Sequence, residues 1–579
     1  MATGWSSSTS RRVRKIERAA VMVEGPTLPA RAVTTAPGAS RRFASPHWLE
    51  YLEPLATRMS STGLARLASG IVAASLLAAA LAVGIGLRTV ALESVPAGFN
   101  QDEACNGYDA YSLLRTGRDQ HGNLLPVAIQ AFNDYRMPLF DYSLIVPVGL
   151  FGLRPAAVRL GAAMWGIADL LALAVLAVLI IGLRGAALAV ALMAFSPWHL
   201  PISRFGHEAI TSAATITLAA AVLFAGMRLG RGRLLLLSGL LFGMSLYSYS
   251  ITKAFILPFL IWTAIVYWRE LKPLGRHALA GLMIIVVSAL PQAWALWRHY
   301  AEMMARFHSL SVLSLPWPLS ARLFVQVLLS DFSPGFLFRN GSPDLALHAP
   351  GYGQLLVAQA AMLFLALCSL GEARFRRVTV FLLGWLAIAG FTAALVLPAG
   401  HPLHSLLMLT PLTLLSALGM VFLFDLAGAS RLARLAVAAA ILLVMVIQGA
   451  RFVSFYFRSY PALAAYDFQY GLGPAVARAA RLGDGPVVIT ANTNQPYIYV
   501  LFFTNYPPKR FQNEPVIQSS GLFGNVQQFD RYRFENPQAA YQTLPHGVFL
   551  FAGWELSPAP PVFTIHSPNG QLAYQVVVK

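Results

Sequence analysis

The sequence predicts a polytopic α-helical membrane protein with about eleven membrane-spanning helices and a small α/β domain at its C-terminal end. Three observations carry this prediction: a composition poor in charge, a series of apolar runs, and basic residues that gather between those runs. Of the 579 residues, 56% are hydrophobic and only 12% are charged, which is about half the charged fraction of a typical soluble protein. So few charges cannot cover the surfaces of several soluble domains. The composition therefore excludes a cytosolic enzyme, a disordered protein and a collagen-like fibre.

Net charge and cysteine content narrow the class further. The formal net charge is +18, because 43 basic residues face 25 acidic ones. In a soluble chain this balance would indicate nucleic-acid binding, but in a membrane chain it first reflects an excess of Lys and Arg in cytoplasmic loops. We therefore expect no nucleic-acid partner. The two cysteines, Cys105 and Cys368, exclude a disulfide scaffold and a multi-cysteine zinc site.

Residues 1–66 form a polar tail rich in Arg and Ser. The tail has no apolar core near its start, so it is not a secretory signal peptide. Its composition faintly imitates a mitochondrial presequence, but we interpret it as a disordered basic tail in the cytoplasm. The first apolar run, residues 67–91, is long enough to cross a bilayer. The basic tail before it places the N-terminus in the cytoplasm.

Residues 138–153 decide the topology. The stretch is apolar, but it has only 16 residues, with Asp141 near its start and Pro147 inside it, and a span needs about 20 residues. We interpret it as one or two amphipathic helices on the outer, periplasmic surface of the membrane. The remaining spans are then 157–182, 185–201, 209–228, 233–252, 254–270, 277–297, 351–371, 377–397, 403–425 and 434–455.

The basic residues between the spans test that choice. They are Arg184; Arg228, Arg231 and Arg233; Arg269, Lys272 and Arg276; Arg374, Arg376 and Arg377; and Arg431 and Arg434. If residues 138–153 do not cross the membrane, every cluster lies on the cytoplasmic side, and if they do cross, every cluster faces outward. The positive-inside rule therefore predicts eleven spans, a cytoplasmic N-terminus and an external C-terminus. Cys105 and Cys368 lie on opposite sides in this topology, so we expect them not to pair.

This topology collects the polar chemistry on the external side. We expect a transmembrane domain over residues 67–458, with large external loops at 92–156 and 298–350, followed by an external domain at 459–579. Strand-like runs alternate with turn residues in the last segment, a pattern typical of a small α/β domain. These runs are 486–490, 497–503, 548–551 and 572–578.

An adjacent pair of acids opens the first external loop. Asp102 and Glu103 follow the first span in a chain with only 25 acids. Two carboxylates at the edge of a bilayer can serve as a general base and as the neighbour that orients it or tunes its pKa. A solvated loop, or a helix N-terminus with favourable acids, explains the pair equally well. Further along the loop, Asp134, Tyr135 and Arg136 could bind a polar substrate, or Asp134 and Arg136 could form a structural salt bridge.

Short motifs recur through the external segments in a fixed order. They are GFNQDE at 98–103, YDAYSLLRTGRD at 108–119, NDYRMPL at 133–139, SPWH at 196–199, SRFGHE at 203–208, YSYS at 247–250, GHPLHS at 400–405 and QPYIY at 495–499. Their order on one membrane face resembles bacterial GT-C glycosyltransferases, in the branch related to protein O-mannosyltransferases and aminoarabinose transferases (glycosyltransferase family 39-like). The resemblance runs from about residue 67 to residue 506. No single motif is highly specific, but the eleven-span count agrees with the mannosyltransferase-like topology.

The resemblance implies a reaction. Such enzymes move a sugar from a polyprenyl-phosphate carrier to an acceptor on the outer face of the bacterial cytoplasmic (inner) membrane, with inversion of the anomeric carbon. The resemblance places the catalytic acid at Asp102, with Glu103 beside it. An acceptor hydroxyl is a poor nucleophile until a positioned base takes its proton during attack. The lipid donor already carries its leaving group, so no obligatory cofactor is expected, in agreement with the lack of a P-loop motif in the sequence.

The leaving phosphate needs positive charge or hydrogen-bond donors at the membrane surface. Polar residues near the outer ends of the spans are the candidates for binding the substrate or the lipid phosphate: Arg204, His207, Glu208, Tyr249, Lys253, His401 and His404. Lys253 is one of five lysines, and a snorkelling side chain is its alternative interpretation. For each histidine the alternative is interfacial hydrogen bonding, and Glu208 is either a helix N-terminal charge or functional. The external loop that contains Asp344 is either a lid or a passive surface loop.

Metal binding and other functions are less well supported. No pair of candidate ligands has a spacing like His-Glu-x-x-His, so we expect a metal-independent transferase. The main alternative is a membrane transporter or lipid flippase of the cell envelope, which predicts internal repeats and charges in the middle of spans. A binding module on a membrane anchor is a weaker alternative, because eleven spans are more than anchoring requires. The sugar and the acceptor, whether protein, lipid or glycan, stay open.

Overall fold

The computed structural model describes residues 61–132, 134–426, 428, 430–518 and 524–579. These residues belong to one compact unit, Tyr51–Lys579. The predicted cytoplasmic tail lies outside the described residues, except for its last six, which already belong to the first helix.

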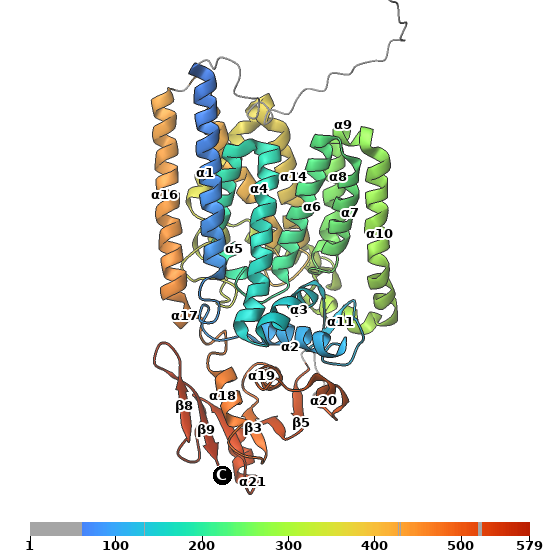
Figure 1. The fold of residues 1–579 in the computed structure, drawn as a ribbon, viewed down its shortest axis with the longest axis vertical. Helices are drawn as coiled ribbons and strands as arrows, with labels where there is room; N and C mark the ends of the chain where they lie inside the picture. Colours follow the sequence, from blue (N-terminus) through green and yellow to red (C-terminus); the bar gives the residue numbers. More distant parts are fainter. Residues whose placement is uncertain (1–60, 133, 427, 429, 519–523) are drawn as a thin grey trace, which may run out of the picture. The chain divides into compact units, whose positions relative to one another are not determined.

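Apolar helices make up most of the described chain (Figure 1). Seven helical segments are long and apolar enough to cross a membrane, so the multi-pass membrane prediction is confirmed. They are α1 (Ser61–Thr89), α4 (Pro155–Ala194), α6 (Ala209–Leu229), α9 (Trp268–Leu271) continued through η2 (Lys272–Leu274) into α10 (Gly275–Arg298), α14 (Ala373–Ala393), η6 (Leu406–Met408) continued into α15 (Leu409–Asp425), and α16 (Arg431–Arg458).

The remaining predicted spans contain shorter helices. These are α7 (Gly232–Ser245), α8 (Thr252–Val266) and α13 (Ala358–Cys368), with η5 (Ser369–Gly371) after the last. The 40-residue α4 covers the predicted span 157–182 and the first part of the predicted span 185–201, and its helical geometry breaks at Gly182, with φ 80° and ψ 176°. A residue with a Cβ rarely adopts this conformation, so glycine allows the chain to turn there. Every predicted span thus contains helix, but eleven membrane crossings stay a prediction.

Basic residues predicted to be cytoplasmic lie at one end of this helix bundle. Arg184, beside the break in α4, donates to Ser69 Oγ at the start of α1, with an N···O distance of 2.6 Å. Arg377 pairs with Glu270, joining the start of α14 to α9. Arg374 similarly pairs with Asp425 at the end of α15, with an N···O distance of 2.7 Å. The last two contacts bring together the basic turns beside α9, α14 and α15, and the cytoplasmic identity of this side stays a prediction.

The loop predicted to be the first external one folds into two helices and a hairpin. α2 (Gln101–Thr116) packs against α3 (Leu139–Phe151), which also packs against α4. β1 (Ile129–Ala131) and β2 (Asp134–Arg136) form an antiparallel pair between the two helices. With 13 residues, α3 is about 20 Å long, too short for a hydrocarbon core of about 30 Å. The helices α7, α8 and α13 of the predicted spans are similarly short, so the interpretation of residues 138–153 as a helix that does not cross the membrane stays a prediction.

The second large loop is also mainly helical. It contains α11 (Tyr300–Leu310), η3 (Val312–Ser314), α12 (Leu319–Asp331) and η4 (Gly335–Arg339). Asp331 is almost fully buried, and its carboxylate accepts a hydrogen bond from the backbone N–H of Gly400, with an N···O distance of 2.9 Å. This contact ties the loop to the turn that carries His401 and His404.

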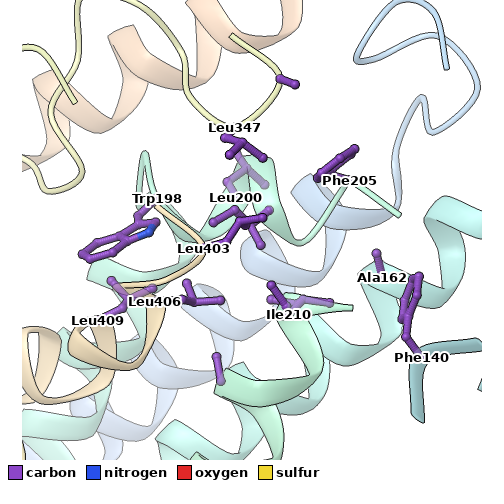
Figure 2. Close-up of a cluster of buried hydrophobic side chains, with 14 of the residues drawn as sticks. Phe140, Ala162, Trp198, Leu200, Phe205, Ile210, Leu347, Leu403, Leu406 and Leu409 are labelled. Carbon is purple, nitrogen blue, oxygen red and sulfur yellow. The ribbon is translucent and has the colours of Figure 1, made fainter. Parts of the chain in front are cut away.

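A buried apolar cluster fixes the turns that precede α6 and η6 (Figure 2). Trp198, Leu200 and Phe205 come from α5 (His199–Ile202) and its flanks, and Leu403 comes from the turn before η6. The indole N–H of Trp198 donates to the carbonyl oxygen of Pro402, with an N···O distance of 2.9 Å. Since all four side chains are at least 96% buried, the polar residues next to them sit on a rigid base.

The chain ends in a sheet domain. Its seven strands follow the order β4-β5-β6-β3-β7-β9-β8, and the central β3 pairs in parallel with β6 and β7. The strands are β3 (Val487–Thr490), β4 (Ile517–Gln518), β5 (Val526–Phe529), β6 (Tyr532–Glu535), β7 (Val548–Ala552), β8 (Phe563–His566) and β9 (Leu572–Val578). Its helices are α17 (Tyr460–Leu463), α18 (Leu472–Ala479), α19 (Pro496–Phe503), α20 (Pro508–Asn513) and α21 (Pro537–Thr543). The predicted α/β architecture is therefore present, and the domain boundaries 67–458 and 459–579 stay predictions.

The predicted strand at residues 497–503 is wrong, because this segment forms α19. Its aromatic and β-branched composition is typical of a strand. However, Pro496 occupies the first helical position, where its fixed φ suits a helix, and the helix packs against α2. A helix that is apolar all round is stable when it is buried, and residues 497–502 are at most 2% exposed.

Thiol labelling tests the predicted orientation. In a Cys368→Ser background, we expect a Gln542→Cys variant, at an exposed position of α21, to react with a membrane-impermeant maleimide on intact spheroplasts. A Gly371→Cys variant, placed where a side chain meets only open space, should react only after permeabilisation. Cys105 is buried and should stay unlabelled in both variants. The reverse pattern would contradict the external position of the sheet domain.

Candidate functional site

A cavity of about 700 Å³ lies between the sheet domain and the helix ends that face it. From the helical part, its wall includes Asp102, His207, Tyr249, His401 and His404. Five residues that the sequence nominates from four separate segments thus meet at one cavity.

Asp102 is positioned by the start of α2. The side-chain oxygen of Asn100, the N-cap residue, accepts a hydrogen bond from the backbone N–H of Asp102, with an N···O distance of 2.9 Å. The amide nitrogen of the same side chain donates to the carbonyl oxygen of Asp467, with an N···O distance of 3.2 Å. Asp102 is partly exposed in the first turn of the helix, where the helix dipole favours a negative charge.

Glu103 completes the cap but turns away from the cavity wall. It is fully buried, and its carboxylate accepts a hydrogen bond from the backbone N–H of Asn100, so the two residues form a capping box. It also accepts from the backbone N–H of Gly206. The guanidinium of Arg159 in α4 donates a hydrogen bond to each carboxylate oxygen, with N···O distances of 2.9 and 3.0 Å. Glu103 therefore holds α2 in place beside Asp102.

Arg159 also binds the backbone of the segment between α1 and α2, which is neither helix nor strand. Its guanidinium donates to the carbonyl oxygens of Leu92, Pro96 and Gly98, with N···O distances between 2.7 and 3.1 Å. Its side chain is fully buried. One cation thus satisfies three backbone carbonyls that no helix or sheet would pair.

Arg204 also binds backbone carbonyls near the end of α1, and it does not line the cavity. It is buried and donates to the carbonyl oxygens of Leu87, Ala91 and Val95. Its guanidinium also lies over the ring of Phe457, 4.9 Å from the ring centroid. The structure therefore places Arg204 as support for the segment that leads to Asp102.

His207 reaches the cavity from the same turn. Its ring stacks on Phe205, with centroids 5.4 Å apart, and lies edge-on to Tyr249, with centroids 6.1 Å apart. The backbone N–H of Ala209 donates to His207 Nδ1, with an N···N distance of 3.1 Å. In the neutral ring this bond places the proton on Nε2, which can then donate. Glu208 lies 3.3 Å from the same Nδ1 and is not part of the cavity wall.

His401 and His404 form a second group of imidazoles. Their rings stack with centroids 4.0 Å apart and an interplanar angle of 23°. The backbone between them is fixed from below by Trp198, which binds the Pro402 carbonyl, and by the apolar cluster around Leu403 (Figure 2). Both rings line the cavity.

Asp134, Tyr135 and Arg136 lie outside the cavity wall. Arg136 pairs with Asp109 at 2.8 Å and with Asp141 at 3.4 Å, not with Asp134. Tyr135 donates to Glu302 of α11, with an O···O distance of 3.3 Å. Burial raises the pKa of Asp109 to about 6, even though the Arg136 guanidinium opposes the shift. This buried cluster joins α2, β2 and α3.

Lys253 is exposed and does not line the cavity. Among the described residues, the cavity wall contains neither Lys nor Arg. Its ionisable groups are the three histidines, the acids Asp102, Asp344 and Asp467, and tyrosines. Burial, together with the nearby Asp344 charge, raises the pKa of Asp467.

Several of these positions carry no signal in the sequence. Arg159 lies within a predicted span, and nothing in its neighbours indicates a partner 56 residues away. Asp467 and Gln469 come from the connection between α17 and α18, and Gln469 donates to Gln101 Oε1 and Tyr499 Oη. In the described part of the chain, no group of three or more His, Cys, Asp or Glu side chains could hold a metal ion.

Comparisons with known proteins identify the fold. No family model and no curated protein matches the chain. ArnT from Cupriavidus metallidurans bound to undecaprenyl phosphate matches with a TM-score of 0.53 and 13% identity, over 89% of this chain and 98% of that one. The apo state of the same protein matches with a TM-score of 0.50 and 14% identity, over 88% and 98%. The apo oligosaccharyltransferase of Archaeoglobus fulgidus gives a TM-score of 0.47 at 13% identity, over 74% and 63%.

ArnT, an aminoarabinose transferase, is a member of the GT-C fold. The match to it over nearly the whole of both chains confirms the GT-C fold that the motifs predict. Identities this low show the fold alone, so the activity has to be argued from the site.

The Glu103–Arg159 pair can be tested by stability. Replacing Glu103 with Gln leaves the Arg159 charge buried without its counterion, which costs about 3–5 kcal/mol of folding free energy. We expect a lower unfolding temperature of the detergent-solubilised protein for Glu103→Gln. The control is Glu93→Gln, which breaks an ion pair with Arg154 in which both side chains are more than half exposed and should cost less than about 1 kcal/mol. Equal unfolding temperatures for the two variants would show that the buried pair does not stabilise this region.

Proposed function

We propose that the protein is a metal-independent, inverting glycosyltransferase that uses a polyprenyl-phosphate-linked sugar as donor, with Asp102 as its general base. The observation that carries the proposal is the placement of Asp102. It stands on a capped helix at the wall of a 700 Å³ cavity, next to the ends of apolar helices that a lipid carrier could approach. The GT-C fold, which this chain shares with a protein crystallised with undecaprenyl phosphate, supports the same class of donor.

The proposed reaction is a single displacement. The Asp102 carboxylate takes the proton of an acceptor hydroxyl while the oxygen attacks the anomeric carbon of the donor sugar. The bond between that carbon and the phosphate oxygen breaks, and polyprenyl phosphate leaves with the electron pair. Because attack comes from the face opposite the phosphate, the anomeric configuration inverts. Asp102 needs no cation to accept a proton, which is why we propose a metal-independent reaction.

The neighbours of Asp102 suit positioning better than proton transfer. Glu103 is fully buried, with both oxygens engaged by Arg159 and by backbone N–H groups. We propose that Glu103 fixes the first turn of α2. The Asp102 carboxylate is then already oriented toward the acceptor before the acceptor binds, so that little conformational entropy is lost on binding.

Histidines are the best-placed groups for the leaving phosphate. Among the described residues, neither Lys nor Arg lines the cavity, so the nitrogen donors of the helical wall are the imidazole rings of His401, His404 and His207 and the side-chain amides of Asn100 and Gln101. A protonated imidazole can add positive charge, which an amide cannot. Donors aimed at developing negative charge stabilise a transition state in a site shielded from water. We propose that the His401–His404 pair binds the phosphate, with His207 and Tyr249 beside the sugar.

The cellular setting follows from the topology. We propose a multi-pass protein of the bacterial cytoplasmic membrane, with the cavity on the outer face and a lipid-linked sugar as its donor partner. The acceptor is then a protein, lipid or glycan of the cell envelope.

Asp102→Asn tests the proposed base. General bases contribute about 10²–10⁴ in rate, so we expect a loss of this size in sugar transfer, with unchanged expression and unfolding temperature. The assay uses a panel of labelled polyprenyl-phosphate hexoses, pentoses and uronic acids with envelope extract as acceptor. Asp484→Asn, which makes the same chemical change at an exposed residue outside the cavity, is the control. Full activity of Asp102→Asn would remove Asp102 from the mechanism, and lipid movement across vesicles without transfer would support the flippase alternative.

Two sets of variants test whether the histidines or Lys253 bind the donor phosphate. His401→Phe and His404→Phe keep a flat ring but remove the N–H donors, and we expect each to lower kcat by about 10²–10³. Lys253→Met keeps the length of the side chain and should change kcat by less than about threefold, because Lys253 does not line the cavity. If the loss were larger for Lys253→Met than for both histidine variants, the phosphate would have to bind on the Lys253 side.

A further inference from the structure

The sheet domain gives the cavity a second wall of a different chemical kind. Its polar side chains there are amides and hydroxyls, which we call the amide wall: Asn492, Thr493, Asn494, Ser567, Asn569 and Gln571. They come from the loop after β3 and from the hairpin between β8 and β9. Among the described residues, the sheet domain contributes no Lys, Arg, Asp or Glu side chain to the cavity after Asp467.

Two exposed aromatic rings accompany the amide wall. Tyr466 is 73% exposed and Trp554 is 56% exposed, although both line the cavity. Their ring centroids lie 5.8 Å apart, with an interplanar angle of 54°. Large aromatic side chains left open beside a cavity are a costly exposure of apolar surface, and they typically mark binding sites.

The turn that carries Trp554 is rigidly built. The Glu555 carboxylate accepts hydrogen bonds from the backbone N–H of Ala552, from Thr490 Oγ1 and from Asn492 Nδ2, each with a heavy-atom distance of 2.7 Å. Gly553 N–H donates to the carbonyl oxygen of Ala573, with an N···O distance of 2.8 Å. A Cβ at Gly553 would collide with the carbonyl oxygen of Leu572. A network of hydrogen bonds around Glu555 and a glycine that tolerates no Cβ thus hold one exposed indole at the cavity.

This set of groups fits a neutral carbohydrate. A sugar ring has a face of polarised C–H bonds, which pack on the negative face of an aromatic ring, and a rim of hydroxyls, which amides and hydroxyls bind in both donor and acceptor roles. An acceptor headgroup that carries phosphate would find no Lys or Arg in this wall. An acidic or basic peptide would likewise find no charged partner there.

We propose that the amide wall, with Tyr466 and Trp554, is the acceptor subsite and that it binds the neutral carbohydrate part of a glycan. This inference rests on the proposed function, because it names the acceptor class for the same cavity. The acceptor sugar lies across the Trp554 and Tyr466 rings and presents one hydroxyl toward Asp102 on the opposite wall.

Binding by the full-length protein in detergent tests the subsite directly. The probes are arrayed neutral oligosaccharides, arrayed acidic oligosaccharides, Ser/Thr-containing peptides, and phosphatidylglycerol vesicles. We expect retention on neutral oligosaccharides, a loss of about tenfold or more in affinity for Trp554→Ala and for Tyr466→Ala, and retention within about threefold for Trp554→Phe, which keeps a ring. Leu556→Ala is the matched control, since Leu556 is 80% exposed two residues further along and does not line the cavity.

Three results would overturn the subsite. In the first, the protein binds peptides or vesicles but not neutral oligosaccharides. In the second, it binds neutral oligosaccharides, but neither alanine variant weakens the binding. In the third, it binds none of the probes. The Asp102→Asn variant keeps this result separate from the proposed function, because it should bind oligosaccharides like the wild type and yet fail in transfer. If transfer persists in that variant while Trp554→Ala still loses sugar binding, the proposed base fails and the subsite stands.

Discussion

The buried ion pair between Glu103 and Arg159 is the interaction on which the rest of the site depends. It joins the first turn of α2 to α4 and lies against the segment between α1 and α2, whose backbone carbonyls have no helical partners. Arg159 satisfies three of them while Glu103 caps α2 and binds the N–H of Gly206. One pair therefore fixes both the helix that carries Asp102 and the turn that carries His207.

The cavity divides its chemistry between two parts of the chain. The helical part contributes ionisable groups, Asp102 and the histidines, on a base packed by apolar side chains (Figure 2). After Asp467, the sheet domain contributes neutral amides and hydroxyls, and its exposed rings Tyr466 and Trp554 accompany them. Such a division suits a transferase, because proton and phosphate chemistry needs charge, whereas a sugar acceptor needs shape and hydrogen bonds. The connection around Asp467 and Gln469 joins the two walls through contacts to Asn100 and Gln101.

Sequence reasoning predicts this protein well where one-dimensional patterns have direct physical causes. Apolar runs predict the membrane class and the helices, and the order of the short motifs predicts the GT-C fold. The motifs also nominate Asp102, which the fold places at the cavity wall and whose role as a base stays a proposal. Prediction from the sequence fails where contacts between residues far apart in the chain determine a side chain's partner or a segment's secondary structure. Arg159 looks like a charge inside a span until the fold brings it to Glu103, and Arg136 pairs with Asp109 and Asp141 instead of Asp134. Residues 497–503 have a strand-like composition, but their burial against α2 makes them a helix.

The central claim is that Asp102 acts on an acceptor hydroxyl beside the anomeric carbon of a lipid-linked sugar. An experimental structure with a non-reactive phosphonate analogue of a polyprenyl-phosphate sugar and an acceptor tests it most directly. The claim predicts an acceptor oxygen about 2.6–3.2 Å from an Asp102 carboxylate oxygen and phosphonate oxygens hydrogen-bonded to His401 or His404. A donor bound with its phosphonate at Lys253, and with Asp102 out of reach of both the acceptor and the anomeric carbon, would contradict it.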